Sequence, residues 1–142
     1  MAALYTADIL RLATDIPFQE RLPDADATVE KRSPVCGSQI VVDVKLDAEG
    51  RVERLGQQVK ACALGQASAA LMGRNALGRS PDDLCQARDA LSAYLAGERS
   101  DPGGWPGLDI FGPAVAYPAR HRSICLAFEA VAEAAANAKA AY

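Results

Sequence analysis

Three of the four cysteines stand where the sequence predicts that a helix or a strand begins or ends. Cys36 is followed by Gly37 between two predicted strands, Cys62 separates a predicted strand from a predicted helix, and Cys125 lies near the start of the last predicted helix. A thiol at such a boundary can be exposed and ionised, whereas a thiol within an apolar run is usually part of the core. The chemistry to expect is therefore that of sulfur or of a bound metal.

His121 and Cys85 complete the set of histidine and cysteine side chains. His121 precedes the last predicted helix near Cys125, which makes it a candidate ligand, although a lone histidine is more often a surface or capping residue. Cys85 lies inside a predicted helix, away from any break, so we interpret it as a partly buried thiol outside the site. Cys62, by contrast, would lie beside the unpaired N–H groups of a helix start, which favour a thiolate.

Composition indicates one ordinary domain over residues 1–142, since half of the residues are hydrophobic, 23% are charged and the net charge is -3. A sequence pI of about 5.1 and the lack of a Lys/Arg cluster argue against a nucleic-acid partner. No stretch approaches the roughly 18 to 20 apolar residues that span a bilayer, and no basic segment precedes an apolar run at the N-terminus. We therefore expect a cytoplasmic protein without a membrane partner.

The spacing of the cysteines limits the kind of site. In a reducing cytosol, four cysteines are not expected to form a disulfide framework, so they are thiols or metal ligands. No Cys-x-x-Cys pair is present, which excludes a zinc ribbon and a thioredoxin motif.

The elements that would position these residues follow from periodicity and from the helix-capping and turn residues. Strict alternation predicts a strand over 39–47, and a turn with Gly50 leads to a returning strand over 51–60 with a bulge at Gly56. The remaining elements are a helix over 4–16, a short strand over 27–31, a helix between Cys62 and Gly78, a helix from the Ser80 cap to Gly97, one helical turn over 108–111 and a final helix over 123–139. This order predicts an α+β fold in which two or three antiparallel strands carry helices on one face.

These motifs together resemble a known family. Val35-Cys36-Gly37-Ser38 precedes an alternating strand, Lys60-Ala61-Cys62 opens a helix rich in Ala and Ser, Ser80-Pro81-Asp82-Asp83 starts the next helix, and Pro118-Ala119-Arg120 precedes the last. In this order they resemble the U-type iron-sulfur cluster assembly scaffolds, namely IscU, SufU and the N-terminal domain of NifU. The resemblance covers the chain from Leu4 to the last helix.

The resemblance implies a ligand set of three cysteines and one aspartate, but only part of it carries over. Cys36 and Cys62 match the first two cysteines, whereas the aspartate position holds Ser38. Without a gap, the third cysteine position falls on Ser123, and Cys125 lies about 200° further around the helix, in the core. With two extra residues before the helix, Cys125 instead completes the site. Both registers remain open, and in the gapless one His121 is a further candidate ligand.

The resemblance also implies a function. We expect a scaffold or carrier rather than an enzyme, holding iron or a 2Fe-2S cluster on its thiolates, with a cysteine desulfurase and apo iron-sulfur acceptor proteins as partners. The alternative is a zinc-containing sulfur acceptor in which Cys62 or Cys36 takes a persulfide, as in a sulfurtransferase. A third hypothesis, which Ser38 and Ser123 favour, is that the chain is a degenerate member of this family that serves as an interaction module.

Overall fold

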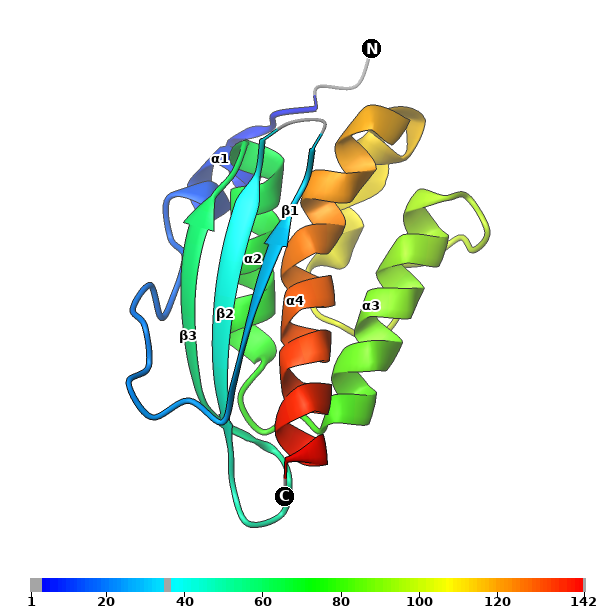
Figure 1. The fold of residues 1–142 in the computed structure, drawn as a ribbon. Coiled ribbons are helices and arrows are strands. Elements are labelled where there is room, and N and C mark those ends of the chain that lie inside the picture. The colour runs from blue at the N-terminus through cyan, green and yellow to red at the C-terminus, as the bar shows by residue number, and fades with distance from the viewer. Residues whose placement is uncertain (1–3, 35–36, 142) are drawn as a thin grey trace.

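A three-stranded antiparallel sheet forms one layer of the molecule (Figure 1). The computed structural model describes residues 4–34 and 37–141. The strands β1 (Ala27–Arg32), β2 (Gln39–Leu46) and β3 (Val52–Lys60) follow one another in space as they do along the chain. The predicted small antiparallel sheet is confirmed.

The alternation of β2 explains why the sheet has one core face. Ile40, Val42, Val44 and Leu46 are all buried and share one face of the strand. Their burial provides the apolar surface on which the helices pack.

Helices cover this core face and form the second layer (Figure 1). The α-helices are α1 (Ala7–Ala13), α2 (Ala63–Asn75), α3 (Pro81–Leu95) and α4 (His121–Ala140), with two 3-10 segments, η1 (Leu108–Ala116) and η2 (Pro118–Arg120), before α4. Helix α4 packs on β1 and β2 and α2 packs on β3, while α1 contacts α2 and α3 contacts α4. The prediction of helices on one sheet face is confirmed.

Capping residues set the helix starts that the sequence predicted. The Ser80 hydroxyl accepts a hydrogen bond from the Asp83 N–H at 3.1 Å, and the Asp83 carboxylate accepts one from the Ser80 N–H at 3.0 Å. Helix α1 is shorter than the predicted 4–16, because Thr6 caps its start and the chain leaves the helix before Pro17.

The bulge in the sheet lies elsewhere than predicted. The register shifts between Lys45 and Leu46, which pair with Arg54 and Val52, so Glu53 is the extra residue and not Gly56. A Cβ at Gly56 would lie 2.3 Å from the carbonyl oxygen of Glu20. This glycine is therefore needed where the chain before β1 crosses the sheet closely.

The alternation of β2 predicts that Asp43 faces water together with Val41 and Lys45, but the crossing chain buries its carboxylate. The Asp43 side chain is fully buried and accepts hydrogen bonds from Arg21 Nε at 2.7 Å, from the Leu22 N–H at 2.9 Å and from the Thr28 hydroxyl. Burial alone would raise the pKa of Asp43, but these hydrogen bonds outweigh it and hold the pKa below its ordinary value. Asp43 thus fastens the segment before β1 to the sheet.

Within the described residues, no helix has the length and apolar character needed to cross a bilayer.

Candidate functional site

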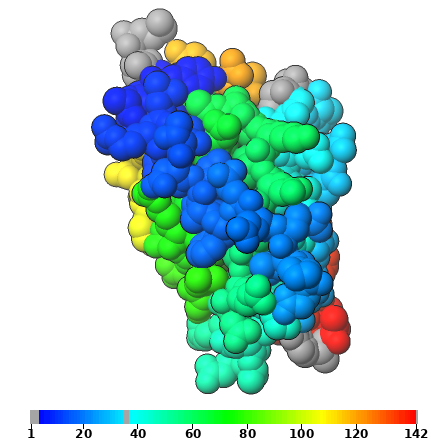
Figure 2. Space-filling view, turned by 90° about the vertical axis from the view of Figure 1, so that its left-hand side faces the viewer, coloured from blue at the N-terminus to red at the C-terminus, as the bar shows by residue number. Residues whose placement is uncertain are grey.

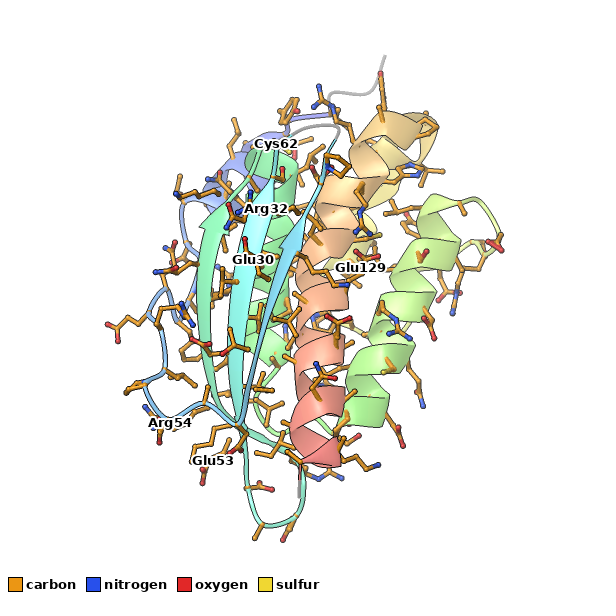
Figure 3. The ribbon with its side chains drawn as sticks, in the orientation of Figure 1. Glu30, Arg32, Glu53, Arg54, Cys62 and Glu129 are labelled. Atoms are coloured by element: carbon orange, nitrogen blue, oxygen red, sulfur yellow. The ribbon has the colours of Figure 1, made fainter. Side chains whose placement is uncertain are left out.

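Cys62 lies at the junction of β3 and α2. It is the N-cap residue of α2, with φ -66° and ψ 169°, and its side chain is half-buried. The N–H groups of the first turn of α2 lie next to it and carry the partial positive charge of a helix N-terminus. Figure 3 shows Cys62 at one end of the sheet, at the opposite end of β3 from Glu53 and Arg54.

Ser38 approaches the same end of the sheet from the turn between β1 and β2. The Ser33 N–H donates to the Ser38 carbonyl at 2.8 Å, and the Gly37 N–H donates to the Ser33 carbonyl at 3.0 Å. Gly37 has φ 71°, which favours glycine over any residue with a Cβ. Cys36, the neighbouring predicted ligand, lies outside the described residues.

Ser123 reaches this position from the first turn of α4. Its hydroxyl oxygen lies 3.1 Å from that of Ser38, within hydrogen-bond distance, and each residue is only 2% exposed. A Cβ at Gly65 would lie 3.2 Å from the Ser123 carbonyl oxygen, so α2 and α4 approach each other closely there. The Ser68 hydroxyl fixes this approach by donating to the Ile124 carbonyl at 2.6 Å.

An open hollow of about 330 Å³ lies over this junction. Its lining includes Gly37, Ser38, Lys60, Cys62 and Gln66. Lys60 is the charged side chain of this lining, so the hollow presents a thiol, a hydroxyl and a positive charge. Such a surface suits a small anionic group or a metal centre that carries thiolate ligands.

Cys125 lies two residues further along α4, in different surroundings. It is 9% exposed and packs in the hydrophobic core. Burial raises the pKa of the Cys125 thiol to about 12, with a further contribution from the negative charge of Glu129 that Arg122 partly offsets. Cys125 is therefore a protonated thiol at neutral pH, and Ser123 is the α4 residue that contacts Ser38.

His121 is the first residue of α4, and its ring contacts the backbone of η1. Its Nε2 lies 2.9 Å from the Ala114 carbonyl oxygen. A carbonyl can only accept a hydrogen bond, so Nε2 donates in this contact.

The chain resembles iron-sulfur scaffold proteins in both sequence and structure. It is 27% identical over 131 residues to the iron-sulfur cluster assembly scaffold protein IscU of Thermotoga maritima, covering 92% of each chain. It superposes on the crystal structure of a nitrogen-fixing NifU-like protein (N-terminal) from Brucella abortus with a TM-score of 0.90 and 36% identity, covering 96% of this chain and 95% of that one. The chain belongs to the U-type iron-sulfur cluster assembly scaffold family.

Two further comparisons concern the fold and the family models. A protein named as an iron-sulfur cluster assembly scaffold for the SUF system of Fervidobacterium islandicum superposes with a TM-score of 0.85, covering 93% of this chain and 96% of that one. Its sequence identity is 17%, so it shows the shared fold alone. No family model matches the chain.

The structure brings together part of the residue set that the family resemblance predicted. Ser38, Cys62 and Ser123 meet at one end of the sheet, while Cys125 lies in the core and His121 is bound to the Ala114 carbonyl. Among residues 4–34 and 37–141, no group of three or more His, Cys, Asp or Glu side chains is placed to hold a metal ion.

Three contributors to the site were not predicted as such from the sequence. Lys60 and Gln66 line the hollow, and Gly65 allows α4 to come close enough for Ser123 to reach Ser38. The signal for Gln66 was its place in the first turn after Cys62, and the signal for Gly65 was a glycine inside a helix, which often marks a close contact. Nothing in the sequence indicated the contact between the two serine hydroxyls.

Proposed function

We propose that this chain is a scaffold or carrier in iron-sulfur cluster assembly, and that the thiolates of Cys36 and Cys62 hold iron or a 2Fe-2S cluster as its cargo. The observation that carries the proposal is the placement of Cys62 at an open hollow that Ser38 also lines, with the Ser123 hydroxyl oxygen 3.1 Å from that of Ser38. Membership in the U-type family and the scaffold function named for the IscU of Thermotoga maritima support it.

The chemistry of the hollow suits such a cargo. Thiolates are the ligands that iron-sulfur clusters prefer, and a thiolate-bound cluster carries negative charge. Lys60 and the first-turn N–H groups of α2 lie where they offset that charge. Because the hollow is open, a bound cluster would stay within reach of another protein, as a carrier requires.

Two classes of partner follow from this role. Sulfur would come from a cysteine desulfurase, and the finished cluster would pass to apo iron-sulfur acceptor proteins. Both would have to approach the same end of the sheet, where β3 passes into α2 (Figure 3).

Anaerobic reconstitution with iron and sulfide tests the proposal. We expect the wild-type chain to gain visible absorption and to retain iron and sulfide after desalting, and we expect Cys36→Ala and Cys62→Ala each to lose both. Cys85→Ala is the matched control, because Cys85 is equally half-buried but lies on α3, away from the hollow. Equal iron content in all four proteins would show that the ligand assignment is wrong.

A second function, sulfur acceptance by Cys62, is favoured by the placement of this half-buried thiol at an open hollow beside the N-terminus of α2. The Cys62 thiolate would attack the terminal sulfur of a desulfurase persulfide, the desulfurase thiolate would leave, and a persulfide would form on Cys62. Zinc in the purified protein, with no cluster after reconstitution and a sulfur adduct on Cys62 after incubation with a desulfurase and cysteine, would favour this function over the scaffold.

A further inference from the structure

A second hollow, of about 490 Å³, lies along the outer edge of β3, away from Cys62. Phe18, Leu22, Leu55 and Leu77 supply its apolar lining. It belongs to the flank that faces the viewer in Figure 2, where the chain before β1, in blue, lies across the green of α2. Nothing in the proposed function uses this hollow.

Phe18 has an unusual backbone conformation there. Among the described residues it is the one non-glycine with positive φ, at 60°, a conformation that is costly for a bulky side chain. Its carbonyl accepts hydrogen bonds from the Gln57 N–H at 2.9 Å and from the Glu20 N–H at 2.7 Å, which anchors the residue to β3. The ring is nevertheless 42% exposed, so internal packing does not account for an aromatic residue in this conformation.

A second exposed apolar side chain at this hollow, Leu77, comes from another part of the chain. It follows α2, is 45% exposed and lines the same hollow as Phe18. Large apolar side chains that remain exposed together around one depression are typical of an interaction surface.

The floor of the hollow is formed by β3 at Leu55, which is only 4% exposed. Phe18 covers the outer edge of β3 at Gln57, and the segment Gly78-Arg79 covers it at Val52. Backbone groups of an antiparallel strand alternate in direction, so the N–H and C=O of Leu55 point to the same side as those of Gln57.

The rim of the hollow is negatively charged. Glu20 and Glu53 line it, and neither carboxylate forms an ion pair within the described part of the chain. Arg54, the positive residue of the rim, is already bound to Asp24 at 3.1 Å. The charge that complements this rim is therefore positive.

We propose that the Phe18–Leu77 hollow binds a segment of a partner protein in which a large apolar side chain is flanked by Lys or Arg. The apolar side chain enters between Phe18 and Leu77, and the basic side chains face Glu20 and Glu53. Because Cys62 lies at the other end of β3, the partner can stay bound while the first hollow carries cargo (Figure 3).

Selection from a random peptide display library on the immobilised protein tests this proposal. We expect enriched peptides with a Leu, Ile, Met or Phe next to Lys or Arg. We expect a synthetic consensus peptide to bind about tenfold or more weakly to Phe18→Gly and to Glu53→Lys. Phe18→Gly keeps the positive φ accessible, and circular dichroism checks that each variant is folded. Leu10→Ser is the control, since Leu10 is 49% exposed on α1 but does not line the hollow.

Three results would overturn the proposal. They are the absence of an apolar-basic consensus, equal binding of the consensus peptide to wild type and Phe18→Gly, and a concentration-dependent dimer mass that Phe18→Gly abolishes. The last result would identify a second copy of the chain as the occupant.

Discussion

Ser123 and Cys125 lie two residues apart in α4 and have different surroundings, because that step turns a helix by about 200°. Ser123 contacts Ser38 at the open end of the sheet, whereas Cys125 packs in the core as a protonated thiol. We predict that Cys125→Ser leaves the iron content after reconstitution unchanged and lowers the free energy of unfolding by about 1 to 2 kcal/mol, because a hydroxyl replaces a weakly polar buried thiol.

Urea unfolding and iron analysis of the same samples check this prediction. Cys85→Ser, at a half-buried position, serves as the control and should lose less stability. If Cys125→Ser lost its iron while keeping its stability, Cys125 would be a ligand and the register with two extra residues before α4 would be correct.

Asp43 is the second residue whose contribution to the free energy of unfolding can be measured. Its carboxylate is buried under the chain before β1. Its folded pKa is lowered, so its stabilising contribution is complete above the unfolded value of about 3.9 and disappears as pH falls through the folded pKa. We predict that Asp43→Asn costs roughly 2 kcal/mol at neutral pH, since an amide cannot accept from all of its donors.

The pH dependence of unfolding provides the check on Asp43. The difference in unfolding free energy between wild type and Asp43→Asn should stay constant from pH 7 to about pH 4 and shrink below that. A difference that grows as the solution becomes acidic would contradict the assignment of a lowered pKa.

At the scale of elements, the site depends on how closely α2 approaches α4. A Cβ at Gly65 would lie 2.8 Å from the Ala61 Cβ and 3.2 Å from the Ser123 carbonyl oxygen. The overlap outweighs the gain in helix propensity of roughly 0.5 to 1 kcal/mol, so we predict that Gly65→Ala lowers the free energy of unfolding by about 1 to 3 kcal/mol. Thermal unfolding with Gly104→Ala as control measures this, because a Cβ at Gly104 meets nothing within 4 Å. A stable Gly65→Ala protein would mean that the two helices are further apart.

The elements were predictable from sequence where a local pattern decides them. The alternation of β2 identified its core face, and Ser80 with Asp83 identified the start of α3. The burial of Asp43 was not predictable, because it depends on where the chain before β1 crosses the sheet. The bulge was predicted at Gly56 and lies at Glu53, because Gly56 serves that close crossing instead. The family resemblance singled out Cys62, Ser38 and Ser123 as positions of the candidate site, whose ligand roles stay a prediction, but the contact between the serine hydroxyls depends on the approach of α2 to α4.

The whole molecule combines a sheet, a covering layer of helices and two separate hollows at different positions along β3. The hollow at Cys62 presents a thiol and positive charge, and the hollow at Phe18 presents apolar side chains and negative charge. A carrier with this arrangement can hold cargo at one end while a partner is bound near the other.

Native mass spectrometry of the anaerobically reconstituted protein is the decisive test of whether Cys36 and Cys62 hold iron and sulfide, because it weighs the cargo on the intact chain. We expect a species heavier by iron and an equal number of sulfides in wild type and Cys85→Ala, and its loss when Cys36 and Cys62 are both replaced by Ala. A wild-type chain that carries neither iron nor sulfide while Cys36 and Cys62 are reduced would contradict it.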